Sequence, residues 1–235
     1  MAGKLYGVSV GPGDPELITI KARKRIESSK TIVYPVRVHG EDSTALNIVK
    51  GSIDLSGKKI EEIIFEMDPD PSVRERNYNE AIKKVASLLE GGDVALINLG
   101  DATVFSTYMH VSLDISDMGY ETETIPGVTS FCAGAAEAKI PLVIDNEGLA
   151  IVSMAKENSA VYNALRDFDN IVVMKAFNSM KTLASMMDEL KIPRDNAVVV
   201  SNVSMADQYV GKFDPKRKYG YFTTAIIKKN KGERK

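Results

Sequence analysis

Residue types that build common catalytic and structural centres are scarce in this chain of 235 residues. It contains no tryptophan, a single cysteine (Cys132) and two histidines (His39 and His110). One cysteine cannot form an internal disulfide, and so few histidines and cysteines leave little material for a zinc site or a histidine-based catalytic triad. We therefore expect no metal site built by the protein.

An excess of charge and long apolar runs are missing as well. The 30 Lys and Arg residues nearly balance the 32 Asp and Glu residues, and the net charge of −2 gives no overall field that would attract nucleic acid. No stretch approaches the roughly 20 apolar residues of a membrane span. The first residues, MAGKLYGVSVGPGD, lack the apolar region of a signal peptide. The sequence thus predicts a cytoplasmic protein that binds neither nucleic acid nor membrane.

Short apolar runs alternate with segments of helical periodicity, which is typical of an α/β fold. In the first half we predict strands at residues 5–10, 31–34, 94–99 and 121–125 and helices at residues 16–28, 78–90 and 106–118. The run at 94–99 is almost entirely apolar, as expected for a central strand of a parallel sheet that is buried on both faces.

The second half shows the same alternation, with strands predicted at 149–154, 171–175, 197–203, 208–213 and 221–227 and helices at 130–138, 159–168 and 179–190. Two strands follow each other without an intervening helix, which indicates a mixed, partly antiparallel sheet. We place a domain boundary near Pro126. This gives an N-terminal α/β domain (1–126) with a mostly parallel sheet and a C-terminal α/β domain (127–235) with a mixed sheet.

Three predicted strand ends carry glycine-rich turns: Gly11-Pro12-Gly13, Gly100-Asp101 and Pro126-Gly127. Ligands of open α/β sheets bind at the carboxyl ends of the strands, where glycine lets a ligand approach the backbone and helix N-termini offer free N–H groups. Each turn alone is also compatible with an ordinary tight turn or helix cap. Three of them together predict a ligand site.

Common nucleotide and hydrolase motifs are missing from these turns. A dinucleotide fingerprint requires a third glycine where Glu16 stands, and the sequence contains neither a P-loop nor a serine-hydrolase elbow. Of the enzyme classes considered, the sequence favours one that catalyses a transfer reaction mainly by binding and positioning its substrates.

Three segments resemble signature regions of the tetrapyrrole (corrin/porphyrin) methylase family, in the same order and spacing. They are VSVGPGDPELITIKA (8–22), LGDATVFSTY (99–108) and ETIPGVTSFCAGAA (123–136), and the runs VVMK (172–175) and YFTTAIIKK (221–229) agree with them. Within the family, the segments VYP (33–35), FSTY and PGVTSF most resemble precorrin-2 C(20)-methyltransferases. Two residues depart from the pattern: Ala102 replaces the usual Pro, which is expected to loosen the turn, and Phe105 stands where Tyr is common.

This resemblance implies two α/β domains, a cleft between them that binds S-adenosylmethionine and releases S-adenosylhomocysteine, and assembly as a homodimer. The cofactor contacts that it implies, matched position by position, are Pro12, Leu99, Gly100, Asp101, Val104, Ser106, Thr107, Thr129, Ser130, Met174, Val203 and Thr224. Thr223 and Thr224, both on the last predicted strand, are the weaker candidates among these positions.

The reaction that the resemblance implies is methyl transfer to carbon 20 of precorrin-2, or of its cobalt form, in cobalamin biosynthesis. Carbon 20 must then lose a proton, and Asp101 is the candidate base by its motif position, with Tyr108 and His110 behind it. Because the macrocycle carries many carboxylates, the cations of long loop-like segments, Arg37, His39, Arg74 and Arg76, are candidates for binding it. Any cobalt would arrive with the substrate.

Alternatives remain at this point. The chain could methylate another carbon of the macrocycle, or act like relatives that modify diphthamide or ribosomal RNA, although the acidic composition disfavours RNA. It could also be a non-catalytic small-molecule-binding module of the same fold, which only Ala102 favours.

Overall fold

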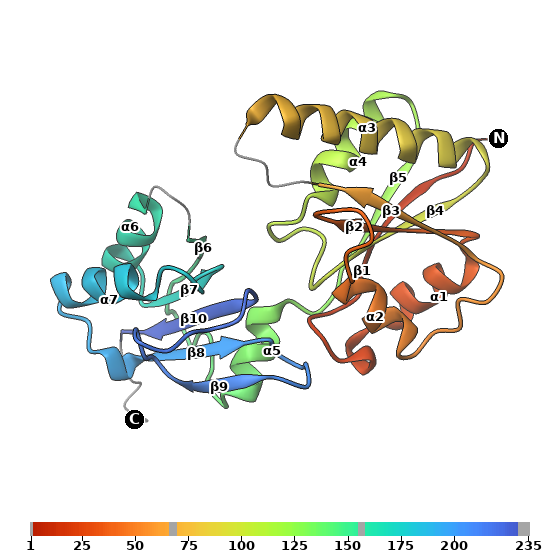
Figure 1. The fold of residues 1–235 in the computed structure, drawn as a ribbon. Coiled ribbons are helices and arrows are strands. Elements are labelled where there is room, and N and C mark those ends of the chain that lie inside the picture. Colours follow the sequence, from red (N-terminus) through yellow and green to blue (C-terminus); the bar gives the residue numbers. More distant parts are fainter. Residues whose placement is uncertain (1, 66–69, 155–157, 230–235) are drawn as a thin grey trace. The chain divides into compact units, whose positions relative to one another are not determined.

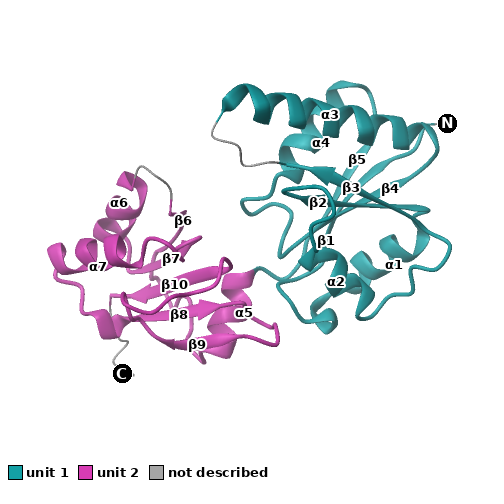
Figure 2. Ribbon diagram, in the orientation of Figure 1, with its two compact units in different colours: residues 1–129 teal, residues 130–235 magenta. Residues whose placement is uncertain are grey.

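The computed structural model describes residues 2–65, 70–154 and 158–229. The chain divides into two compact units, residues 1–129 and 130–235 (Figure 2). No helix among the described residues is long and apolar enough to cross a membrane.

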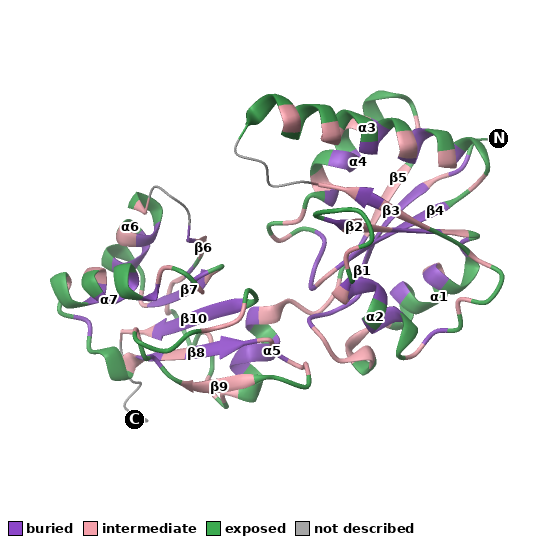
Figure 3. Cartoon of the chain, in the orientation of Figure 1, coloured by how far each residue is buried: buried purple, intermediate pink, exposed green. Residues whose placement is uncertain are grey.

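Unit 1 is built on a five-stranded sheet in the order β3-β2-β4-β1-β5, and every strand pair in it is parallel. The strands are β1 (Leu5–Ser9), β2 (Thr31–Val36), β3 (Lys59–Ile64), β4 (Val94–Asn98) and β5 (Thr122–Ile125). All residues of β1 and β4 are buried, in agreement with their central position (Figure 3). The predicted parallel sheet of the first half is confirmed.

Helices cover both faces of this sheet (Figure 1). On one face, α1 (Ile20–Ser28) and α2 (Thr44–Lys50) share a core cluster with Val8 and Ile97. On the other, α3 (Pro71–Glu90) and α4 (Tyr108–Asp117) share a cluster with Leu5. The alternation of side chains along β1 therefore supplies both cores.

The segment between β2 and α3 differs from the prediction. It holds α2 and β3, and α3 begins at Pro71, so Arg74 and Arg76 lie on a helix and not on a loop. Two local features hid these elements. Polar and charged residues occupy most of the first two turns of α3 (PSVRERNY) and mask its apolar period, and β3 carries Glu61 and Glu62 among its isoleucines.

The predicted helix at 16–28 is also interrupted. The Asp14 carboxylate accepts a hydrogen bond from the Glu16 N–H, but this cap starts only a 3-10 turn, η1 (Pro15–Leu17). Helix α1 begins anew after Thr19, whose hydroxyl accepts a hydrogen bond from the Ala22 N–H. The chain between the two caps is extended at Ile18, and this extended residue separates the two helical turns.

Unit 2 contains a second five-stranded sheet in the order β6-β7-β10-β8-β9. Its strands are β6 (Leu149–Ser153), β7 (Asn170–Met174), β8 (Ala197–Ser201), β9 (Tyr209–Lys212) and β10 (Thr223–Lys228). Only β6 and β7 pair in parallel, and β10 lies antiparallel to both β7 and β8. This confirms the predicted mixed sheet.

The helices of unit 2 are α5 (Ser130–Glu137), α6 (Ser159–Asp167) and α7 (Met180–Glu189), with a short 3-10 turn η2 (Arg194–Asn196). Helices α6 and α7 share a core cluster with β7 and β10 on one face of the sheet. Helix α5 approaches the sheet closely, since a Cβ at Gly134 would lie 3.1 Å from the Val200 side chain.

Tyr108 attaches α4 to β1, an interior strand of the sheet of unit 1. Its residue surface is 1% exposed, and its ring occupies the space above Gly7, where a Cβ would lie 2.0 Å from the ring carbon Cζ. The hydroxyl donates to the Glu123 carbonyl at 3.3 Å and accepts from the Thr124 hydroxyl at 3.3 Å. One side chain thus fixes α4 against both β1 and β5.

We predict that Gly7→Ala lowers the free energy of unfolding by about 1–3 kcal/mol, because the added methyl group overpacks the contact with the Tyr108 ring. Gly91→Ala is the matched control. Gly91 has φ −86° and its Cβ would have only an ordinary contact, 3.4 Å from the Leu88 carbonyl. Urea unfolding measures both variants, and equal stabilities of Gly7→Ala and the unchanged protein would contradict the packing argument.

Candidate functional site

The three glycine-rich turns lie at one edge of the sheet of unit 1. Strand β1 lies between β4 and β5, so the carboxyl ends of these three strands are neighbours. The Gly100 N–H donates to the Gly11 carbonyl at 2.7 Å, and the Gly11 N–H donates to the Gly100 carbonyl at 3.2 Å. This isolated bridge joins the first two turns directly.

The Asp101 carboxylate joins the second turn to the third. Its Oδ2 accepts the Gly127 N–H at 2.7 Å, and its Oδ1 accepts the N–H of Thr103 at 2.8 Å together with the Thr103 hydroxyl. Gly127 has no room for a side chain, because a Cβ there would lie 2.5 Å from the Ser9 Cβ. Glycine at position 127 therefore permits both the close approach and the hydrogen bond.

The pKa of Asp101 follows from these contacts. Burial acts to raise it, but the hydrogen bonds from Gly127 and Thr103 outweigh this effect and hold the pKa below its ordinary value. A carboxylate with both oxygens engaged and a lowered pKa is a weak proton acceptor. The geometry favours a positioning role for Asp101, and its predicted role as a base stays a prediction.

Two buried polar residues complete this edge. The Ser9 hydroxyl, at the end of β1, accepts the Ala102 N–H at 2.8 Å. The Asn98 Oδ1, at the end of β4, accepts the Ser106 hydroxyl at 2.9 Å, and the Ser106 Oγ accepts the Tyr108 N–H at 3.2 Å. Sequence reasoning missed Ser9 and Asn98, although a single polar residue that ends an apolar buried strand (LYGVS, VALIN) is a readable signal.

The hydrogen bond to Ser9 changes the interpretation of Ala102. A proline there would have no N–H to donate to Ser9. The expected loosening of the turn by Ala102 is therefore offset by a hydrogen bond, and Ala102 itself is fully buried.

Gly100 presents open backbone at the centre of this edge. Its φ is +69°, and a Cβ there would meet no atom within 4 Å. Phe105, four residues after Asp101, also has a positive φ (+50°) and its residue surface is 49% exposed. A non-glycine residue with a positive φ, such as Phe105, carries local backbone strain, and such residues are frequent at ligand-binding sites.

Most predicted site residues of unit 1 lie along the loops of this edge: Pro12, Leu99, Gly100, Asp101, Val104, Ser106 and Thr107. Tyr108 is the exception. Its burial in the core beneath α4 leaves no surface on which a substrate could be deprotonated, so the structure does not support the predicted catalytic role.

Three predicted residues of unit 2, Met174, Val203 and Thr224, lie at one edge of its sheet. Thr224, near the start of β10, pairs with Met174 at the end of β7 and with Val200 on β8. Val203 follows β8 and is buried. Ser130 is the first residue of α5, and Thr129 is the last residue of unit 1.

Backbone strain marks this edge too. Lys175 follows β7 directly, and Asn202 and Ser204 follow β8, and all three have positive φ values of 51–62° without being glycine. The sequence did not indicate these positions, because residue type alone does not reveal that a lysine or serine adopts the left-handed backbone conformation.

Comparisons with known proteins identify the family of this chain. A family model for Tetrapyrrole (Corrin/Porphyrin) Methylases matches residues 4–214. The probable cobalt-precorrin-2 C(20)-methyltransferase of Methanocaldococcus jannaschii is 34% identical over 235 residues, covering 97% of each chain. The cobalt-precorrin-2 C(20)-methyltransferase of Salmonella typhimurium is 32% identical over 236 residues, covering 97% of this chain and 98% of that protein.

Solved structures show the same fold. A cobalt precorrin-4 methyltransferase has a TM-score of 0.76 at 19% identity, covering 96% of this chain and 94% of the other. A uroporphyrin-III C-methyltransferase of Thermus thermophilus, solved in complex with S-adenosylhomocysteine, has a TM-score of 0.70 at 20% identity, covering 96% and 92%. The chain belongs to the tetrapyrrole methylase family.

We predict that Asp101→Asn lowers the free energy of unfolding at pH 7 by about 1–3 kcal/mol, because an amide cannot accept all the N–H and O–H donors that surround Asp101. The folded-state pKa lies below the unfolded value, so this stabilisation is present above about pH 4 and disappears as the pH falls through the folded-state pKa. The difference between the two proteins should therefore shrink in acid.

Urea unfolding between pH 7 and pH 3 measures this. Thr103→Val is the control, because it removes the hydroxyl donor but keeps the Thr103 N–H, so its loss should be smaller. A gap between Asp101→Asn and the unchanged protein that stays constant down to pH 3 would show that the charge of Asp101 does not stabilise the turn.

Proposed function

We propose that this chain transfers a methyl group from S-adenosylmethionine to carbon 20 of precorrin-2, or of its cobalt complex, in cobalamin biosynthesis. The observation that carries the proposal is near-full-length similarity to two cobalt-precorrin-2 C(20)-methyltransferases, at 34% and 32% identity. The family's signature turns also lie together at one edge of a parallel sheet, where ligands of such sheets bind.

The edge in unit 1 suits a sulfonium compound. Open backbone at Gly100 admits a close ligand approach, and Leu99 and Val104 add apolar surface. When bound, the cofactor supplies an electrophilic methyl group whose cationic sulfur becomes neutral during transfer. A bare carboxylate beside it would stabilise the starting state more than the transition state. The carboxylate of Asp101 is instead occupied by Gly127 and Thr103.

The chain's contribution to rate is mainly positioning, because the transfer is an in-line displacement between two bound molecules. In it the bond from sulfur to methyl breaks, the bond from methyl to carbon 20 forms, and carbon 20 then loses a proton. We extend the proposal to the cofactor contacts Pro12, Leu99, Gly100, Asp101, Val104, Ser106, Thr107, Thr129, Ser130, Met174, Val203 and Thr224. Homodimer assembly and a cytoplasmic location are part of the same proposal.

The alternative of a non-catalytic module loses its support, because the turn at Ala102 is held closed by Ser9. The direct test incubates the protein with methyl-¹³C-labelled S-adenosylmethionine and either cobalt-precorrin-2 or precorrin-2, and locates the label by NMR. Label at carbon 20 is expected. Label at another carbon would favour the other-carbon alternative, and cofactor binding without transfer to either ring would favour the non-catalytic module.

We predict that Gly100→Ala weakens S-adenosylhomocysteine binding at least about tenfold, because the added methyl group projects into the space assigned to the cofactor. Gly57→Ala is the matched control. Gly57 has φ +74°, close to the +69° of Gly100, and a Cβ at either position would meet no atom within 4 Å. Both variants therefore carry the same backbone strain.

Titration calorimetry with S-adenosylhomocysteine measures the affinity, and urea unfolding checks that both variants lose similar stability. Equal affinities of Gly100→Ala and Gly57→Ala would remove Gly100 from the cofactor site.

A further inference from the structure

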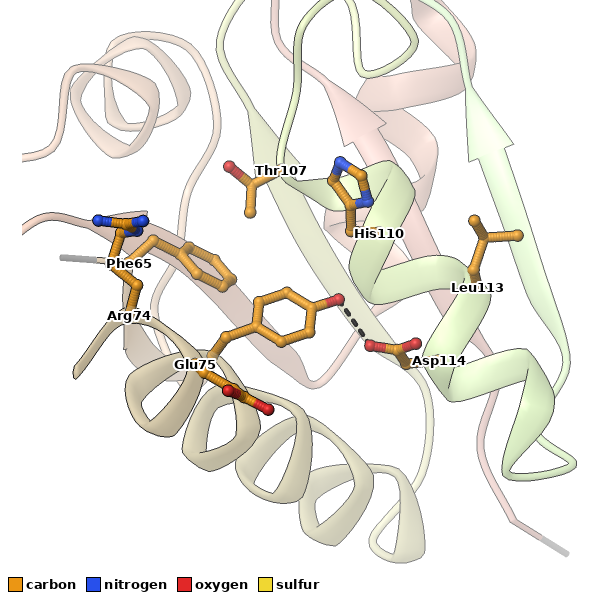
Figure 4. A pocket seen from close by; sticks show the side chains of 8 residues that line it. Phe65, Arg74, Glu75, Thr107, His110, Leu113 and Asp114 are labelled. Atoms are coloured by element: carbon orange, nitrogen blue, oxygen red, sulfur yellow. Dashed lines mark hydrogen bonds between the residues drawn. The ribbon is translucent and has the colours of Figure 1, made fainter. Parts of the chain in front are cut away.

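The segment from Gly100 to Thr107 runs from the open backbone of the proposed cofactor edge to the start of α4. Thr107 and His110 line a pocket of about 500 Å³ between α3 and α4 (Figure 4). Within the segment Gly100 and Phe105 both have a positive φ, +69° and +50°. Because strain at a non-glycine residue such as Phe105 persists only where surrounding contacts fix the backbone, the anchors of this segment decide its conformation.

Two side chains at the ends of neighbouring strands anchor the segment. Near its end, the Asn98 Oδ1 at the end of β4 accepts the Ser106 hydroxyl at 2.9 Å. Near its start, the Ser9 hydroxyl at the end of β1 accepts the Ala102 N–H at 2.8 Å. Ser9 therefore holds the turn from a strand other than β4, which leads into it.

The contact between Ser9 and Ala102 is enclosed in the protein. Both residues are 0% exposed, so solvent does not compete for their hydrogen bond. The Ser9 Cβ also packs against Gly127, where an added Cβ would come within 2.5 Å of it. Since a buried N–H that loses its acceptor is destabilising, the Ser9 hydroxyl fixes the position of Ala102.

The same contact restricts which residues position 102 can hold. In proline the ring carbon Cδ takes the place of the amide hydrogen, roughly 1.5 Å from the nitrogen. The Ser9 Oγ lies 2.8 Å from that nitrogen, on the side to which the N–H points. The Cδ atom would therefore lie far inside van der Waals contact with Ser9, so Ser9 and a proline at position 102 exclude each other.

We propose that Ser9 is a positioning residue for the cofactor, which holds the Gly100–Ala102 turn in its binding conformation and requires an N–H at position 102. The identity of the ligand rests on the proposed function. Ser9 has no exposed surface, so it acts through Ala102 and not by contact with the ligand. A turn that is correctly formed in only about one molecule in five lowers the apparent affinity about fivefold.

Titration calorimetry with S-adenosylhomocysteine tests the Ser9 hydroxyl. Ser9→Ala should weaken binding about fivefold, the scale of one net hydrogen bond. Ser29→Ala is the matched control, because Ser29 is 1% exposed and its hydroxyl donates to the Arg25 carbonyl at 2.9 Å. Ser29 precedes β2, at the amino end of the parallel sheet. This control should lose a similar stability in urea and keep its affinity within about twofold of the unchanged protein.

A double-mutant cycle tests the exclusion between positions 9 and 102. Ala102→Pro alone should weaken S-adenosylhomocysteine binding at least about tenfold, because the proline ring and the Ser9 Oγ compete for the same space. Ser9→Gly removes both Oγ and Cβ, so the double variant should bind more tightly than Ala102→Pro alone. Recovery of folded protein in the double variant would be the same result where Ala102→Pro alone does not fold.

Two outcomes overturn the proposal. One is an unchanged affinity in Ser9→Ala, or an equal loss of affinity in Ser29→Ala. The other is an equal effect of Ala102→Pro beside Ser9 and beside Ser9→Gly. The proposed function fails separately, if the unchanged protein does not bind S-adenosylhomocysteine, and the stabilities of the cycle in urea then still decide whether positions 9 and 102 exclude each other.

Discussion

The hydrogen bond from the Gly127 N–H to the Asp101 carboxylate holds the candidate site of unit 1 together. It connects the ends of β4 and β5 across the end of β1, which lies between them. The Gly11–Gly100 bridge and the Ser9–Ala102 bond depend on the same spacing of strand ends. Because the bond is charge-assisted and partly buried, it is stronger than a bond between neutral groups. The Asp101 carboxylate and the Gly11–Gly100 bridge together keep the three turns in register, while a Cβ at Gly100 would meet no atom within 4 Å.

The electrostatics of the proposed cofactor edge follow from the contacts of one side chain. The carboxylate of Asp101 is turned into the protein, where two backbone N–H groups and the Thr103 hydroxyl donate to its oxygens. The edge therefore places no bare carboxylate beside a bound sulfonium, where such a charge would stabilise the starting state of methyl transfer more than its transition state.

The features that could be predicted from the sequence are those that depend on local residue patterns. Apolar runs located nine of the ten described strands within one or two residues at their starts, and the glycine turns located the site edge. It missed β3 because the glutamates of that strand are compensated from afar, Glu61 by Lys84 and Glu62 by His39. The position of Ser9 at the end of an apolar strand is visible in the sequence, but its partner is not, since Ser9 and Ala102 are 93 positions apart. Tyr108 looked catalytic because it follows the signature turn, and only the packing on Gly7 reveals it as core.

The contact between Gly7 and Tyr108 also constrains how this sequence can diverge. A side chain at position 7 needs the volume that the phenol ring now fills, so position 108 must shrink before position 7 can grow. The reverse order passes through an overpacked, destabilised intermediate. A smaller residue at 108 would in turn give up the two hydroxyl contacts to β5. The two positions are therefore epistatic. A path to a larger residue at position 7 has to begin with a substitution at position 108.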